Sequence, residues 1–262
     1  MKKIAAIVLG LSVLAGFAYY ILILQISSLD RSLYAIDLDQ VRKLATETEG
    51  ALPIAVNAEA PAQVVFPAAA VVTGWGWSAH TLPIYAYQVV FPRGHVMIDS
   101  AMSAEQASAM GDAPFDSASY DRLVSALGNA RQIVFTYPEG ALDGYEPLSY
   151  DRMYALAPGI VLIEATGHTP GSQIVYVRLQ NAQEYLFIGD VAWHYAGINL
   201  VRPRPNLVSR FFLGEDRPRT HAQVAELKSL EAENPGLAII VGHDAGRTKD
   251  QMESGLLGNR FQ

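Results

Sequence analysis

The stretch Thr166-Gly-His-Thr-Pro-Gly-Ser172 decides the fold of this chain, together with two later segments of similar design. It follows an apolar run at 160–165, and two later apolar runs end in Gly189-Asp190 and in Gly242-His243-Asp244. Each segment passes from a β-type apolar stretch directly into a His or an Asp. Because strands of one sheet end at a common edge, this pattern presents His and carboxylate side chains to a single point, as a metal site requires.

These three segments resemble the C-terminal half of the metal site of the metallo-β-lactamase fold. The resemblance implies that His168 is the third histidine of a first metal site and that Asp190 is the carboxylate that bridges two metals. It implies that His243 is the histidine of the second site. In this family a metal-bound water is the nucleophile, because a divalent ion lowers the pKa of water from about 16 to about 7. Asp190 and His168 are therefore the expected catalytic residues.

The N-terminal half of the expected site is altered. A strand in the family ends in Thr-His-x-His-x-Asp-His-x-Gly, whereas here the strand at 132–135 runs into Thr136-Tyr-Pro-Glu-Gly-Ala-Leu-Asp-Gly144. The flanking Thr136 and Gly144 fit the family motif. All four metal-binding side chains between them are replaced, by Tyr137, Glu139, Ala141 and Leu142.

Two interpretations of the remaining residues stay open. In the first, an altered site binds at most one divalent metal, zinc or another, through His168 and Asp190 with Glu139 or His243 as a further ligand. It binds the metal weakly, because two or three ligands cannot close a coordination shell. The protein is then a metallo-β-lactamase-fold hydrolase derived from a metal-dependent hydrolase. In the second, the residues are a structural remnant, and the chain is a catalytically inactive domain that binds a ligand or a partner. The sequence does not name the substrate and leaves open whether the protein is an enzyme.

Two other residues lie near the expected cleft in sequence terms. His194, four residues after Asp190, is either a substitute ligand or substrate contact, or a plain loop histidine, and no spacing rule demands the first. Asp99 matches a family aspartate that braces the loops of the metal site, and its simpler role is to form the turn at a strand end.

A loop after Asp190 combines basic and aromatic residues. It contains Arg202, Arg204, Arg210 and Phe211-Phe212. Such a loop binds an anionic substrate, contacts a membrane surface, or is simply solvated, and we favour the last of these.

Composition excludes several classes of function. With 262 residues, 50% hydrophobic and 17% charged, the chain is long and apolar enough for one large globular domain. A net charge of −7, with no basic cluster beyond Lys2-Lys3, argues against a nucleic-acid partner. The absence of cysteine excludes disulfides and thiolate ligands, so only His and carboxylate side chains are available to hold a metal.

Residues 4–24 form 21 consecutive positions without a charge, which is long enough to span a bilayer. We favour an uncleaved anchor over residues 1–25, because apolar residues continue beyond a small-residue sequence at Gly16-Phe-Ala18 that resembles a signal cleavage site. Lys2 and Lys3 then keep the N-terminus in the cytoplasm, and the domain lies on the periplasmic or extracellular side. The alternative is a cleaved signal peptide and a secreted protein.

The rest of the chain divides into a tether at 26–68 and a metallo-β-lactamase-like domain at 69–262. Within the tether the spacing of apolar residues predicts a helix at 37–48, and the domain opens with an expected strand at 69–73. A short helix is expected at 149–156. Strand hairpins interleaved with helices indicate a mixed α/β fold, and the resemblance sharpens this to an αββα sandwich of two mixed β-sheets flanked by helices.

Overall fold

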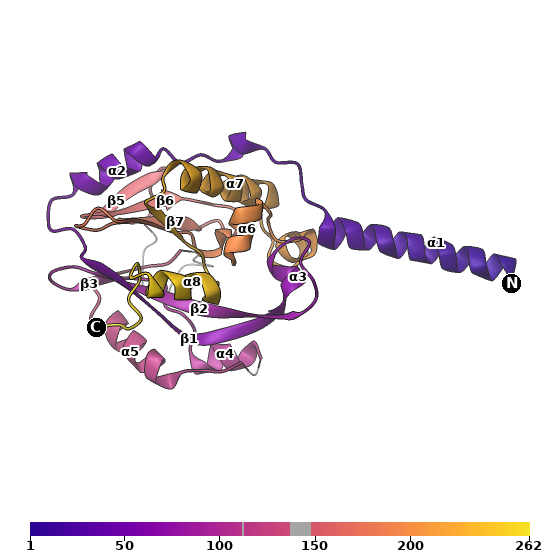
Figure 1. The fold of residues 1–262 in the computed structure, drawn as a ribbon, viewed down its shortest axis with the longest axis horizontal. Helices are drawn as coiled ribbons and strands as arrows, with labels where there is room; N and C mark the ends of the chain where they lie inside the picture. The colour runs from indigo at the N-terminus through magenta and orange to yellow at the C-terminus, as the bar shows by residue number, and fades with distance from the viewer. Residues whose placement is uncertain (112, 137–147) are drawn as a thin grey trace.

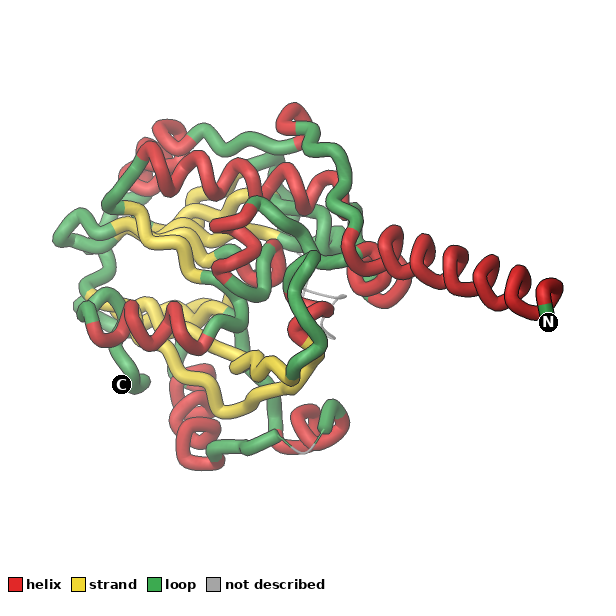
Figure 2. Tube along the Cα trace, turned by 45° about the vertical axis from the view of Figure 1, so that its right-hand side comes forward, coloured by secondary structure: helices red, strands yellow, loops and turns green. Residues whose placement is uncertain are grey.

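The computed structural model describes residues 1–111, 113–136 and 148–262. Two β-sheets face each other, and helices cover their outer faces (Figure 1). Figure 2 shows the same arrangement from a second side, with two layers of strands between layers of helix. This architecture confirms the αββα sandwich expected from the sequence.

The first sheet has four strands in the chain order β1-β2-β3-β4. They are β1 (Ala55–Pro67), β2 (Ala79–Val90), β3 (His95–Ile98) and β4 (Gln132–Val134). The first two pairings are antiparallel, and β3 pairs with β4 in parallel, with Ile98 opposite Val134. The carboxyl ends of β3 and β4 therefore lie side by side, which brings Asp99 next to Thr136.

The second sheet has five strands, also in chain order. They are β5 (Met153–Ala157), β6 (Ile160–Glu164), β7 (Gln173–Arg178), β8 (Glu184–Phe187) and β9 (Leu237–Ile240). Because β7 is antiparallel to both β6 and β8, and β8 is parallel to β9, strands β6, β8 and β9 run in one direction. Their carboxyl ends meet at one edge of the sheet, where the three segments singled out in the sequence begin.

Helices flank both sheets. The α-helices are α1 (Lys2–Tyr19), α2 (Leu38–Glu47), α3 (Ala68–Val71), α4 (Ala104–Ala109), α5 (Ser117–Gly128), α6 (Tyr195–Leu200), α7 (Arg217–Glu233) and α8 (Ala245–Glu253). Shorter helical turns are η1 (Tyr20–Leu24), η2 (Arg31–Leu33), η3 (Gly189–Val191) and η4 (Leu207–Phe212). Helices α2 and α7 lie over the five-stranded sheet, and α4 and α5 lie under the four-stranded sheet (Figure 1).

Apolar side chains fill the space between the sheets. Tyr87 and Ile98 from the first sheet pack with Val175, Phe187 and Ile240 from the second, and all five are buried. A second apolar cluster joins the outer face of the five-stranded sheet to α2 and α7. Both faces of this sheet are therefore buried, which explains why its strands are continuous apolar runs in the sequence.

The segment expected as a tether, 26–68, is part of the folded unit. Val41 and Ala45 of α2 are fully buried against the five-stranded sheet, so the predicted helix is confirmed but is not a linker element. Strand β1 contains a register shift between Glu59 and Ala62, which interrupts the alternation of apolar and polar residues. The interrupted pattern hid this strand, and the domain boundary was therefore placed too late in the chain.

Two local predictions were wrong. The expected strand at 69–73 is mostly helix α3. The second half of the expected helix at 149–156 belongs to β5, which pairs with β6 at the edge of its sheet. Both segments are short, and the apolar spacing of so few residues does not distinguish a helix from a strand.

The N-terminal helix projects away from the sandwich (Figure 1). Within Lys2–Leu24 the most apolar window of 18 residues has a mean hydropathy of 2.4, so this segment is long and apolar enough to cross a membrane by length and composition.

Candidate functional site

The three residues expected from the sequence lie at the carboxyl ends of three strands. His168 lies in the loop after β6, Asp190 in η3 after β8, and His243 in the turn between β9 and α8. All three are buried, with exposed fractions of 7%, 8% and 7%. Parallel strand direction alone therefore brings together side chains that are up to 75 positions apart in the sequence.

Asp190 is the centre of the cluster. Its Oδ2 lies 3.1 Å from His168 Nε2, and its Oδ1 lies 2.9 Å from His243 Nε2. One carboxylate thus holds two imidazole rings, one on each oxygen, and each ring presents its Nε2 atom to the same group.

Fixed acceptors hold the opposite side of each ring. His168 Nδ1 lies 2.7 Å from Glu215 Oε1, and His243 Nδ1 lies 2.9 Å from the carbonyl oxygen of Pro83. Histidines that bind metals are usually oriented in this way, by a carboxylate or a carbonyl on the nitrogen that does not face the metal. The rings are therefore held with Nε2 directed at the centre of the cluster.

A neutral imidazole has one N–H, yet each of these rings faces an oxygen acceptor on both nitrogens. The geometry is satisfied when the ring is protonated, or when a cation takes the place of the proton between Nε2 and Asp190. Accordingly, although burial disfavours the charged ring, hydrogen bonds to Asp190 and Glu215 raise the pKa of His168 to about 9. Contact with Asp190 also outweighs burial at His243 and raises its pKa. Burial alone would raise the pKa of Asp190, but the two histidines hold it well below its ordinary value.

A buried arginine supports the cluster from behind. Arg204 pairs with Glu215, and its Nη2 donates to the backbone oxygen of Asp190 at 2.7 Å. Its guanidinium also lies 4.9 Å from the ring centre of Trp193. We expected Arg204 in a solvated loop, but it is only 3% exposed, because it neutralises a carboxylate that is buried with it. No motif in the sequence pointed to Glu215.

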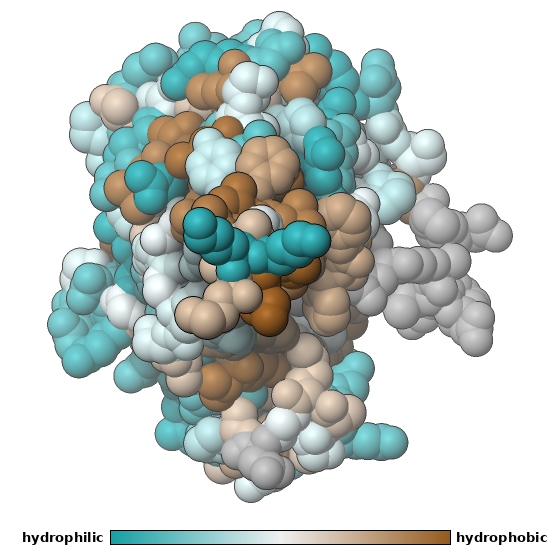
Figure 3. All heavy atoms as spheres, turned by 90° about the vertical axis from the view of Figure 1, so that its right-hand side faces the viewer, coloured by the Kyte–Doolittle hydropathy of each residue, from teal (hydrophilic) through white to brown (hydrophobic). Residues whose placement is uncertain are grey.

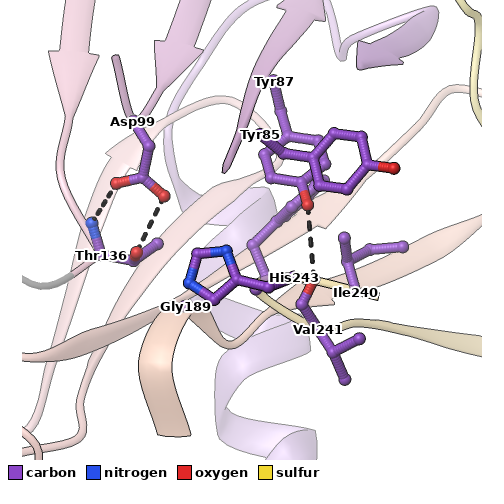
Figure 4. A pocket seen from close by; sticks show the side chains of 10 residues that line it. Tyr85, Tyr87, Asp99, Thr136, Gly189, Ile240, Val241 and His243 are labelled. Atoms are coloured by element: carbon purple, nitrogen blue, oxygen red, sulfur yellow. Dashed lines mark hydrogen bonds between the residues drawn. The ribbon is translucent and has the colours of Figure 1, made fainter. Parts of the chain in front are cut away.

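Asp99 holds the start of the altered loop. Its Oδ1 accepts a hydrogen bond from the Thr136 backbone N–H at 2.7 Å, and its Oδ2 accepts one from Thr136 Oγ1 at 2.8 Å (Figure 4). Burial raises the pKa of Asp99 to about 7. Asp99 and Thr136 line a cavity of about 10 Å³ together with Tyr85, Tyr87 and His243, which is room for about one water molecule.

The four replaced positions, Tyr137, Glu139, Ala141 and Leu142, lie outside the described residues. The expected contribution of Glu139 to a metal site therefore stays a prediction.

His194 has a structural contact of its own. Its Nδ1 accepts a hydrogen bond from the Ala196 backbone N–H at 3.0 Å, so it caps the start of α6. The same nitrogen lies 3.2 Å from Asp244 Oδ2, and the ring packs edge-on against Trp75 with the centroids 4.8 Å apart. Burial lowers the pKa of His194. These contacts favour the plain loop histidine over the substitute ligand.

Within residues 1–111, 113–136 and 148–262, no group of three or more His, Asp and Glu side chains is arranged to hold a metal ion. His168, Asp190 and His243 nevertheless offer two nitrogen donors and one carboxylate, a donor set that suits zinc. The orientation of both rings fits a metal site, and the number of donors fits one ion rather than two.

Comparisons with known proteins identify the fold. No family model matches the chain, and no curated protein matches it in sequence. Among solved structures, a quorum-quenching N-acyl homoserine lactone lactonase superposes with a TM-score of 0.61 and 15% identity, over 77% of this chain and 97% of that chain.

Two further solved structures agree. An N-acyl homoserine lactone hydrolase, with its product bound at a catalytic metal center, gives a TM-score of 0.58 and 12% identity, over 76% of this chain and 96% of that one. A probable metal-dependent hydrolase from Staphylococcus aureus gives a TM-score of 0.55 and 12% identity, over 75% of this chain and 91% of that one. This chain therefore has the metallo-β-lactamase fold.

Proposed function

We propose that this protein is a membrane-anchored hydrolase of the metallo-β-lactamase fold, with a reduced site that holds at most one divalent ion. His168, Asp190 and His243 are the proposed ligands, and Glu139 is the candidate for a further one. The observation that carries the proposal is that each histidine faces acceptors on both ring nitrogens, with Nε2 on Asp190. A divalent cation held by the two Nε2 atoms and the carboxylate would take the place of the protons between them.

The chain's own residues have distinct parts in this proposal. A divalent ion with an open position supplies a water of lowered pKa for attack on a carbonyl or phosphoryl group. Glu215 would hold the proton of His168 on Nδ1 and so direct Nε2 toward the ion. Arg204 offsets the charge of Glu215 and fixes the backbone of Asp190. Asp99 holds the backbone of Thr136, from which the altered loop begins.

The membrane part of the proposal is supported by α1 and η1, and by Lys2 and Lys3 at their start. Basic residues before a span favour the cytoplasmic side, so the domain lies on the other side. C-terminal reporter fusions test this topology. If a reporter that functions only in the cytoplasm is active in this fusion, the proposed topology is excluded. A mature N-terminus near Tyr19 would show that the segment is a cleaved signal rather than an anchor.

Metal binding is tested on the full chain in detergent, by its melting temperature with zinc and with a chelator. A ligand that binds only the folded state raises the melting temperature. We expect a zinc-dependent rise that His243→Ala abolishes, and metal-dependent hydrolysis of simple lactones and esters that Asp190→Ala abolishes. Lactones come first because two of the neighbours act on them. The control is His95→Gln, since His95 is buried in the first sheet and contacts the Ala126 carbonyl.

The alternative is a catalytically inactive domain that binds a ligand or a partner. One observation favours it: the two histidines and Asp190 satisfy one another by ion pairs without a metal. In that case zinc leaves the melting temperature of the wild type unchanged, and this outcome would reject the metal site.

A further inference from the structure

The end of the N-terminal helix is embedded in the domain. Ile23 is only 4% exposed, and the Asn206 side-chain amide donates to the Ile21 carbonyl oxygen at 2.8 Å. Arg217 donates from Nη2 to the Gln25 carbonyl oxygen and from Nη1 to Ser27 Oγ, both at 2.9 Å. Arg217 itself is 1% exposed. The helix is therefore fixed to the domain by buried polar contacts rather than joined to it by a loose linker.

The length of free helix matches the thickness of a bilayer. Residues 2–20 are all exposed, and 21–23 begin to be covered by the domain. At 1.5 Å per residue the free part is about 28 Å long, against about 30 Å for the hydrocarbon core. The free helix is no longer than the hydrocarbon core, so no spacer separates the bilayer from the domain. A span formed by this helix therefore brings the domain surface around its base to the membrane interface.

That surface carries exposed aromatic side chains. Trp77 is 58% exposed, and its Nε1 donates to the hydroxyl of Tyr19 at 3.2 Å, so a residue of the domain lies level with a residue of the span. In η4, which follows Asn206, Phe211 and Phe212 are 73% and 74% exposed. Figure 3 looks at this face with the helix directed toward the viewer.

We propose that Trp77 and η4 form a docking face that seats the domain on the same bilayer that α1 crosses. Trp and Tyr are enriched at membrane–water interfaces, and Trp and Phe are typical of helices that lie in the interface. Arg210, exposed beside Phe211, adds a positive charge that suits anionic headgroups. The inference rests on the proposed anchoring, which supplies the bilayer. The competing occupant is a second copy of this chain.

The test uses the full-length chain reconstituted into vesicles of phosphatidylcholine and phosphatidylglycerol with brominated acyl chains. Phe212→Trp places a fluorophore on the docking face, and Val124→Trp places one at a half-exposed position on α5, on the far side of the four-stranded sheet. The wild-type signal of the three native tryptophans is subtracted from each. We expect bromolipid to quench the added fluorescence of Phe212→Trp at least twofold and to leave that of Val124→Trp unchanged.

Two further measurements separate the outcomes. Flotation of the same vesicles reports anchoring by itself: protein that does not float contradicts the proposed anchor, whereas floating protein with unquenched Phe212→Trp overturns only the docking face. The tryptophan emission of Phe212→Trp could instead shift when the protein is diluted with excess lipid, without being quenched by bromine. That result would assign the face to a second copy of the chain and would also overturn the proposal. In Phe211→Ser/Phe212→Ser we expect the anchor to hold and the quenching of Trp77 to fall, and unchanged quenching would likewise contradict docking through η4.

Discussion

Replacing Asp190 with Asn tests the electrostatics of the buried cluster in the metal-free protein. The change keeps the shape of the side chain and removes the charge that two imidazoles share. The pKa of His168 is about 9 in the fold, against an ordinary value of 6.5. At 1.36 kcal/mol per pKa unit, the cluster stabilises the fold by about 3 kcal/mol through His168 alone.

The sign of the pH dependence follows from the raised pKa. A group with a raised pKa in the fold contributes fully below its unfolded value, and the contribution is lost as the pH rises through the folded value. Glu215 keeps part of this stabilisation in the variant, so Asp190→Asn should cost about 1–3 kcal/mol near pH 6, and much less near pH 10. The pKa of His243 is also raised, so this residue makes the destabilisation by Asp190→Asn larger at low pH than at high pH as well.

The assay is urea unfolding of the full chain with a chelator present, at pH 6 and at pH 10, for the wild type and the variant. Asp39→Asn is the matched control, because its side chain is 95% exposed, and we expect it to cost no more than about 0.5 kcal/mol at either pH. A cost for Asp190→Asn that is independent of pH, or that grows as the pH rises, would refute the shared-charge account of the cluster.

Three further changes have defined outcomes. Glu59→Gln breaks the pair between the buried Glu59 carboxylate and the partly exposed Arg122, 2.6 Å apart, and should destabilise the fold at pH 7 in urea unfolding. Because hydrogen bonds outweigh burial and lower the pKa of Glu59, this loss should be present above the ordinary glutamate pKa of about 4.3 and should shrink as the pH falls below it. Glu215→Gln should weaken zinc binding about 10- to 100-fold in competition titrations, and an unchanged affinity would show that its bond to His168 does not orient the ring. Gly242→Ala places a Cβ 2.8 Å from the Gly189 carbonyl oxygen, so it should lower the free energy of unfolding by about 1–3 kcal/mol in urea unfolding. An unchanged free energy of unfolding would contradict the close packing of these strand ends.

The sequence predicted the fold and the clustering of three candidate site residues because both depend on strand ends. His168, Asp190 and His243 each follow an apolar run, and runs that are parallel in one sheet deliver their last residues to one edge. No contact between distant segments had to be known for this argument.

The surroundings of the site were not predictable in the same way. Glu215 and Arg204 lie in a region without regular strand or long helix, and only the folded chain shows that they pair beside His168. The register shift in β1 broke the pattern that would have identified it as a strand. The contacts of Arg217 with Gln25 link segments 192 positions apart, which no local pattern reports.

Metal content per chain tests the central claim most directly. The full-length protein, purified in detergent and dialysed against metal-free buffer, is assayed for zinc, manganese and iron by elemental analysis, beside His168→Ala and His243→Ala. The account predicts at most one weakly retained ion per chain, refilled to one by added zinc in the wild type and lost in both variants. Two tightly retained ions per chain in the wild type, or one ion that is retained in both variants, would contradict the account.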